Sequence, residues 1–243
     1  MNLRAIFHLI AYMLVVLGLA MLTCCGISRY YGDTPAVQQG LLISGIGVTL
    51  LGGLLFLATK GPVDLSRRDG FGIVTLGWVA AALCGALPYL LTGTITDPAA
   101  AVFETMSGFT TTGASVLTDL ETFPRGVLFW RALTHWFGGM GVLVLCVAIL
   151  PFLGVGGMQI FRAEMPGPSK DRLTPRIATT AKLLWFVYVL LCALLTVLLW
   201  LGGMTVFDAL CHTFATMATG GFSTRTLSVG AYNSTYFDIV III

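Results

Sequence analysis

The chain has 243 residues, of which 57% are hydrophobic and 10% are charged, and its mean hydropathy is +0.92. This composition excludes an ordinary soluble domain and predicts a protein that crosses a membrane several times. The formal net charge of +2 is uninformative, and we expect no nucleic-acid partner.

Apolar stretches of about 20 residues, the length that crosses a bilayer, recur along the chain. They cover residues 6–27, 36–58, 71–91, 127–150 and 180–201, and residues 236–243 begin another. The first stretch could pass for a signal peptide, but no small-residue cleavage site closes it, so we expect a retained helix. We therefore predict an all-α polytopic membrane protein. The six cysteines lie in or beside these stretches, and we expect buried packing residues rather than disulfides or metal ligands.

Basic residues gather on alternate sides of the predicted spans, and the side richer in them should face the cytoplasm. That side carries Arg4, Lys60, Arg67, Arg68, Arg162, Lys170, Arg172, Arg176 and Lys182. The opposite side carries Arg29, Asp33, Asp97, Asp119, Glu121 and Arg225. We therefore expect a cytoplasmic N-terminus and polar loops that enter the membrane from outside.

We expect four segments along the chain. Gly61-Pro62 marks the first boundary, after a two-helix N-terminal unit at residues 1–60. Residues 61–160 form a unit of helix, polar loop and helix, and residues 161–178 form a cytoplasmic connection. Residues 179–243 repeat the helix and loop, with the second crossing incomplete in this sequence.

A polar stretch, FETMSGFTTTGAS at residues 103–115, lies between two apolar segments. It is too short and too polar to cross a bilayer, so we interpret it as a re-entrant loop. Such backbone is tolerated at membrane depth only where it lines a water-filled path or is buried in protein. Thr111, Thr112, Gly113 and Ala114 suit a row of carbonyls facing an ion, because glycine reaches the positive φ that turns them toward one axis.

A shift of 108 residues places this stretch on a second one, with Thr111 on Thr219 and Gly113 on Gly221. The same shift pairs Ala101 with Ala209, Thr105 with Thr213, Ser115 with Ser223 and Thr118 with Thr226. Matches of polar residues are improbable in so apolar a chain. We therefore predict an internal repeat whose second loop contains Thr219, Gly220, Gly221 and Phe222. Parallel copies can surround an axis normal to the membrane, which is the geometry of a pore.

Each loop follows a helix-start pattern. Thr94-Ile-Thr-Asp97 and Thr205-Val-Phe-Asp208 both match a capping box, and Pro98 suits a first helical position. We expect short helices that end just before Thr110 and Ala218. Their partly negative C-terminal ends would then point toward the loops and favour a cation.

Arg131 and His135 lie four residues apart and so share a helix face in the span at residues 127–150. They could reach Glu104 on the first short helix and brace it. The alternative is that Arg131 snorkels to the outer interface. We expect the glycines at 138, 139 and 141 to permit close backbone packing against the loop rather than to bind a ligand.

Three stretches closely resemble the TrkH branch of the Trk/Ktr superfamily of bacterial potassium transporters. They are FETMSGFTTTGAS, THWFGGMGVLVLCVAILPFLGVGGMQIFRAEMPGPSKD and FATMATGGFST. The resemblance covers essentially the whole chain. It implies four repeats, each giving one glycine-centred loop to a potassium filter. Potassium would then be bound by the backbone carbonyls of Thr111, Thr112, Gly113, Thr219, Gly220 and Gly221, with Ala114 and Phe222 beside them.

The resemblance also implies potassium as the transported ion, no organic cofactor and a place in the bacterial inner membrane. Family members form homodimers and bind a cytoplasmic nucleotide-binding ring of the TrkA type. Only two of the four loops are present in this sequence, and the third and fourth filter segments and the family's intramembrane gating loop are absent from it. We therefore expect that these 243 residues alone do not transport.

Two other classes of function remain open. An intramembrane protease would use Ser107 with His135 or His212, but the sequence has no Gly-x-Ser-x-Gly elbow and no His-Glu-x-x-His motif. A non-conducting structural subunit would not need polar re-entrant loops, and the repeat of those polar positions argues against it.

Overall fold

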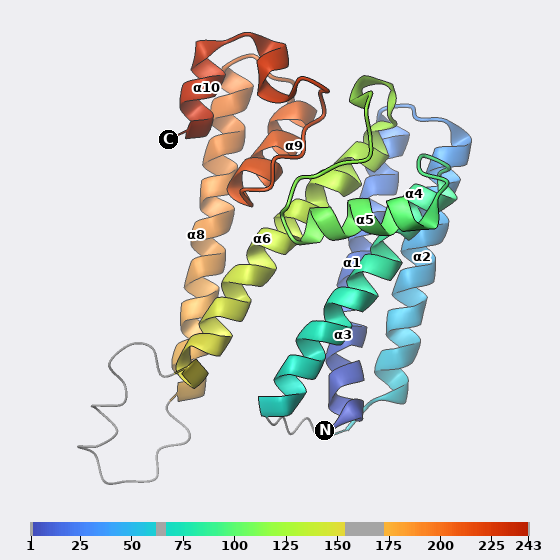
Figure 1. The fold of residues 1–243 in the computed structure, drawn as a ribbon, viewed down its shortest axis with the longest axis vertical. Coiled ribbons are helices and arrows are strands. Elements are labelled where there is room, and N and C mark those ends of the chain that lie inside the picture. Colours follow the sequence, from blue (N-terminus) through green and yellow to red (C-terminus); the bar gives the residue numbers. More distant parts are fainter. Residues whose placement is uncertain (1, 62–66, 154–172, 243) are drawn as a thin grey trace, which may run out of the picture.

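The computed structural model describes residues 2–61, 67–153 and 173–242, and within these ranges the regular structure is helical. Long helices run side by side along the molecule, and the short helix α5 lies across them (Figure 1). The starts of α1, α3 and α8 share one end of the molecule, and α10 lies at the opposite end. This arrangement agrees with the predicted alternation of sides.

Two helices form the N-terminal unit, α1 at Leu3–Tyr30 and α2 at Pro35–Ala58. They pack closely because glycines lie between them. A Cβ on Gly18 would lie 2.6 Å from the backbone nitrogen of Thr49, and one on Gly52 would lie 2.8 Å from that of Val15. Small residues of this kind allow membrane helices to approach each other.

The predicted span at residues 71–91 is not one continuous helix. Helix α3 covers Arg67–Gly85 and the short helix α4 covers Leu87–Leu91. Pro88 has no N–H to continue the helical ladder, and the chain breaks just before it. The indole Nε1 of Trp130 donates to the Gly85 carbonyl at 3.0 Å, which satisfies a backbone group left free at the break.

The remaining elements follow in chain order. They are α5 at Pro98–Phe109, η1 at Leu120–Thr122, α6 at Arg125–Leu153, α8 at Leu173–Leu201, α9 at Val206–Met217, η3 at Ser228–Tyr232 and α10 at Thr235–Ile242. Four helical stretches among the described residues are long and apolar enough to cross a membrane: Leu3–Tyr30, Pro35–Ala58, Arg68–Leu91 and Thr180–Leu201. The predicted all-α polytopic architecture is confirmed.

The two short helices, α5 and α9, end where the sequence predicted, but the first capping box is wrong. Asp97, not Thr94, caps α5 by accepting from the backbone nitrogen of Ala100 at 3.0 Å. The Thr94 hydroxyl donates instead to the Tyr89 carbonyl. The second box is present, because Thr205 Oγ1 accepts from Asp208 N at 3.1 Å and donates to Asp208 Oδ2 at 2.9 Å.

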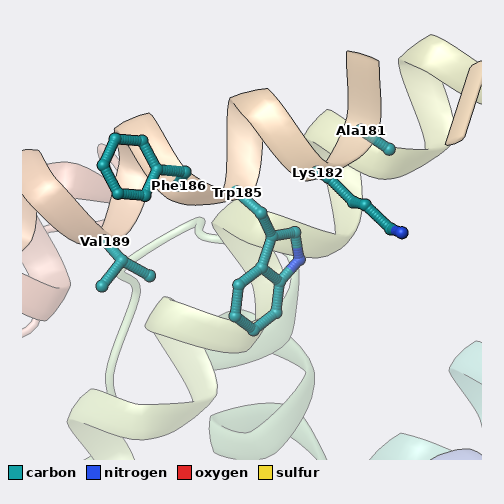
Figure 2. Close-up of a pocket in the computed structure, with 5 residues that line it drawn as sticks. All are labelled: Ala181, Lys182, Trp185, Phe186 and Val189. Carbon is teal, nitrogen blue, oxygen red and sulfur yellow. The ribbon is translucent and has the colours of Figure 1, made fainter. Parts of the chain in front are cut away.

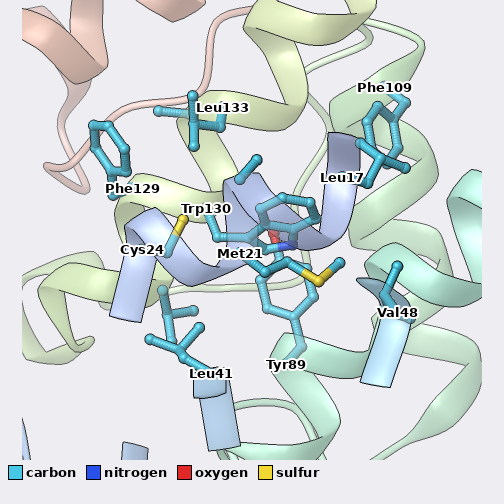
Figure 3. Packing of buried hydrophobic residues seen from close by; sticks show 14 of the residues in the cluster. Leu17, Met21, Cys24, Leu41, Val48, Tyr89, Phe109, Phe129, Trp130 and Leu133 are labelled. Carbon is cyan, nitrogen blue, oxygen red and sulfur yellow. The ribbon is translucent and has the colours of Figure 1, made fainter. Parts of the chain in front are cut away.

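A buried cluster joins α1, α2, α4 and α6 and fixes α6 against the N-terminal helices (Figure 3). Trp130 of α6 and Tyr89 of α4 are fully buried beside Met21 of α1. Cys24 belongs to the same cluster, as expected for a packing residue. The cluster therefore positions the N-terminal half of α6, which carries Arg131 and His135.

Residues 161–172 of the predicted connection at 161–178 lie outside the described residues. They include Arg162, Lys170 and Arg172. Helix α8 begins at Leu173, so the last part of the predicted connection is helical.

Candidate functional site

The two loops have the same unusual backbone. Thr111 and Thr219 each have a φ of 54°, Gly113 has a φ of 77° and Gly221 a φ of 93°. A β-branched residue rarely adopts positive φ, and holding it there costs about 1–3 kcal/mol. The expected positive φ of both glycines is present. The loops, predicted from a shift of 108 residues, therefore match in conformation as well as in sequence.

The hydrogen bonds at the ends of α5 and α9 also match. In the first loop Thr111 N donates to Gly108 O at 3.0 Å and Thr112 N to Ser107 O at 2.9 Å. In the second loop Thr219 N donates to Thr216 O at 2.9 Å and Gly220 N to Ala215 O at 2.8 Å. This is a Schellman-type helix end, whose left-handed position is usually glycine. Threonine occupies that position in both loops.

The loops touch each other at their glycines. A Cβ built on Gly113 would lie 1.9 Å from the carbonyl oxygen of Gly220. Within the described residues, no hydrogen bond ends on the carbonyl oxygens of Thr111, Thr112, Gly113, Thr219 or Gly221. The Ala114 carbonyl differs, because it accepts from Ser107 Oγ at 2.6 Å.

In each repeat a side-chain contact at hydrogen-bond distance joins the short helix to the residues that follow the loop. Glu104 of α5 accepts from Ser115 Oγ at 2.9 Å, and His212 Nε2 of α9 lies 3.0 Å from Ser223 Oγ. The shift of 108 residues pairs Glu104 with His212 and Ser115 with Ser223. The same contact is therefore made in both repeats, by a carboxylate in the first and by an imidazole in the second. This repetition gives the His212 and Ser223 pair a structural role.

Arg131 is buried and contacts both repeats. Its Nε lies 2.6 Å from Glu104 Oε1, and its Nη1 donates to the Ser223 carbonyl at 3.0 Å. Its guanidinium carbon lies 3.5 Å from the centre of the Phe222 ring, a cation–π geometry. With 3% of its side chain exposed and an ionic partner, Arg131 does not snorkel.

The sequence suggested that His135 could reach Glu104. In the structure its hydrogen bonds go elsewhere, and the ring lies between the two loops. Its Nδ1 is 2.8 Å from the Gly108 carbonyl, and its Nε2 accepts from the backbone nitrogen of Phe222 at 3.2 Å. The imidazole stacks on the Phe222 ring with centroids 4.0 Å apart. Sequence reasoning missed the anchoring role of Phe222, whose matching position in the first loop is the small Ala114.

Glycines of α6 allow this close contact. A Cβ on Gly138 would lie 2.1 Å from the Phe109 carbonyl oxygen, and one on Gly139 would lie 2.9 Å from the Ala218 Cα. The predicted packing role is therefore confirmed for these two glycines. Among the described residues, a Cβ on Gly141 would meet no atom within 4 Å, so no such packing is seen at Gly141.

Beyond the loops, two polar clusters join the repeats, and the sequence predicted neither. Glu121 accepts from both the backbone nitrogen and the hydroxyl of Thr226, and these hydrogen bonds lower the pKa of the Glu121 carboxyl. Buried Asp208 accepts from Thr224 Oγ1 at 2.6 Å and lies near Arg125 and Arg225, at 3.7 and 3.6 Å.

Two hollows lie near these elements. One of about 310 Å³ lies against the second loop and is lined in part by Thr219, Gly221 and Phe222. The other lies on α8 and is lined by Ala181, Lys182, Trp185, Phe186 and Val189 (Figure 2).

The model of the TrkH family, described as a cation transport protein, matches residues 38–243. The chain belongs to the TrkH family.

Curated relatives in this family are named Trk system potassium uptake proteins. TrkH of Escherichia coli (strain K12) is 43% identical over 251 residues, which cover 100% of this chain and 50% of the relative. TrkH of Vibrio parahaemolyticus is 41% identical over 250 residues with the same coverage. TrkG of Escherichia coli is 36% identical over 244 residues, covering 98% of this chain and 50% of the relative.

The crystal structure of the potassium transporter TrkH from Vibrio parahaemolyticus has a similar fold. The TM-score is 0.86 at 36% sequence identity, and the match covers 100% of this chain and 48% of the other. The chain thus spans about half the length of the curated relatives that it matches.

The TrkH family is a family of transporters rather than enzymes. The site agrees, because Ser107 Oγ donates to the Ala114 carbonyl, and His135 and His212 hydrogen-bond other groups. The protease alternative is therefore set aside.

Proposed function

We propose that the chain contributes two filter loops to a potassium-selective pathway across the bacterial inner membrane, as part of a channel-like uptake protein. The observation that carries this proposal is the shared backbone of the two loops, with positive φ at Thr111 and Gly113 and again at Thr219 and Gly221. Positive φ recurs at every second residue in both loops, and this conformation is used where the backbone approaches a ligand closely. A short loop can then offer several carbonyls to one cation.

The proposed ligands of the transported ion are backbone carbonyl oxygens on facing stretches of the two loops. They belong to Thr111, Thr112, Gly113, Thr219, Gly220 and Gly221, with Ala114 and Phe222 flanking them. The contact between Gly113 and Gly220 supports this arrangement, because it brings the two sets of carbonyls to one place. The partly negative C-terminal ends of α5 and α9 precede the loops and favour a cation over an anion.

Potassium is proposed as the ion because the relatives are named potassium uptake proteins. We also propose that the N-terminus is cytoplasmic and that the loops are re-entrant from outside. From the resemblance, we propose that the complete protein is a homodimer that binds a nucleotide-binding ring of the TrkA type. The name "Trk system" in the relatives supports the view that more than one component acts together.

Selectivity measurements on two glycine variants test the proposal. Gly113→Ser and Gly221→Ser, made in the complete gene product that contains these residues, should admit sodium alongside potassium, because serine is strained at positive φ. Gly47→Ser is the matched control, since Gly47 lies on α2 without positive φ and a Cβ there would meet no atom within 4 Å. Unchanged potassium preference in both loop variants would favour the alternative of a non-conducting structural subunit.

A further inference from the structure

The imidazole of His135 joins two segments that are far apart in sequence and belong to different repeats. On one side it meets Gly108, in the last turn of α5. On the other side it meets Phe222, the residue after Gly221. Both contacts are buried, and His135 itself is 0% exposed. The positions of the two loops relative to each other therefore depend in part on this side chain of α6, beside the contacts of Arg131.

The two partners determine the protonation of the ring. The Gly108 carbonyl can only accept a hydrogen bond, so Nδ1 must carry the proton. The Phe222 N–H can only donate, so Nε2 must present its lone pair. His135 therefore bridges the loops as a neutral, Nδ1-protonated imidazole. Each ring nitrogen is hydrogen-bonded to one of the two loop segments.

The bridge continues into the backbone of each loop. The Gly108 carbonyl also accepts from Thr111 N at 3.0 Å, and Thr111 is the first residue of positive φ in the first loop. In the second loop, a Cβ built on Gly220 would lie 2.3 Å from His135 Nε2, so the ring lies directly against that residue. His135 thus touches the residues on both sides of Gly221.

We propose that His135 is a positioning residue that sets the spacing of the two loops and thereby contributes to the preference for potassium over sodium. The inference rests on the proposed function of the loops. It goes further because it assigns selectivity to a side chain that offers no ligand to the ion. A filter of carbonyls discriminates through the number and placement of those carbonyls, so the distance between the loops matters.

Three substitutions separate the two nitrogens, with uptake of potassium and of sodium measured in cells that express the complete gene product. His135→Leu removes both hydrogen bonds and should lower the preference for potassium about tenfold, the order of effect expected from losing two hydrogen bonds of modest net contribution. His135→Gln can place its amide oxygen within reach of Phe222 N but loses the contact to Gly108, so it should restore part of the preference. His135→Asn can donate to the Gly108 carbonyl but loses the contact to Phe222, so it should also restore only part of the preference.

The amount of each variant in the membrane is measured in parallel, and His8→Leu is the matched control, since His8 hydrogen-bonds Thr59 and stacks on Phe56 of α2. If His135→Leu does not accumulate, the comparison of Gln and Asn with wild type decides, and a preference equal to wild type in both would overturn the role of His135. Equal preference in wild type and all variants would overturn the role of His135 and leave the proposed function standing. Equal loss in Gln, Asn and Leu would also overturn it, because general packing would then explain the effect. A wild-type protein without potassium preference would overturn the proposed function itself.

Discussion

Gly113 and Gly221 match each other under the repeat, yet their surroundings differ. A Cβ on Gly113 would overlap the Gly220 carbonyl oxygen, whereas a Cβ on Gly221 would meet no atom of the described residues within 4 Å. Both residues have positive φ, at 77° and 93°. The first glycine is therefore required for the contact between loops and for the backbone, and the second for the backbone alone.

This difference predicts unequal effects of alanine at the two positions. Gly221→Ala costs only the strain of an L-residue at positive φ, about 1–2 kcal/mol. Gly113→Ala adds a clash with a backbone oxygen. It should reduce uptake of rubidium, used as a potassium analogue, much more than Gly221→Ala does in the complete gene product. Uptake assays at equal protein levels measure both effects. Equal uptake in the two variants would contradict the contact between the loops.

Removal of Arg131 should destabilise the protein strongly. Arg131→Met leaves the fully buried Glu104 without its ionic partner, which costs about 3–5 kcal/mol. Adding Glu104→Gln to Arg131→Met should recover part of the stability, because no unpaired charge then stays buried. Thermal unfolding in detergent measures both variants. Arg125→Met is the control, since Arg125 is 38% exposed and lies 3.7 Å from its partner. An Arg131→Met protein as stable as this control would contradict the buried bridge.

The cluster of Glu121 and Thr226 predicts a dependence on pH. Hydrogen bonds from Thr226 lower the pKa of Glu121 in the folded protein. The stabilisation is therefore complete above the pKa of an unfolded glutamate, about 4.3, and is lost as the pH falls through the lower folded value. Thr226→Val should reduce thermal stability at pH 7, and the difference from wild type should shrink at pH 3. Asp119→Asn, an exposed neighbour, is the control. A difference that grows on acidification would be the wrong sign.

Labelling of single cysteines tests the orientation. In a cysteine-free background, an impermeant thiol reagent should label Asp119→Cys in intact cells and Lys60→Cys only after permeabilisation. Both native side chains are exposed, and the basic residues near Lys60 predict a cytoplasmic side. The reverse pattern would overturn the proposed topology.

Much of the fold could be predicted from the sequence because apolar length alone identifies spans. Helices α1 and α2 contain the predicted stretches at residues 6–27 and 36–58. The break at Ala86 was missed, although Pro88 signals it. For α5 two sequence signals disagree, because the capping-box spacing places the cap at Thr94 and Pro98 as a first helical residue places it one residue before Pro98. Pro98 at the first helical position favours Asp97, which is the residue that caps the helix.

The loops themselves could be predicted from the repeat, but the contacts between repeats could not. His135 and Phe222 are 87 residues apart, and Glu121 and Thr226 are 105 residues apart. Neither contact has a local spacing that a helix or turn would impose. They follow from the way α6 packs against α9, and only the tertiary structure supplies that information.

The most direct test of the central claim is to locate the ion. Thallium(I) is a potassium mimic with strong anomalous scattering, and crystals of the complete gene product grown with it can be compared with crystals grown in sodium. We predict an anomalous peak between the backbone carbonyls of Thr111 to Gly113 and those of Thr219 to Gly221, and its loss in sodium. Ordered thallium elsewhere in the protein, with none between these two stretches, would contradict the proposed pathway.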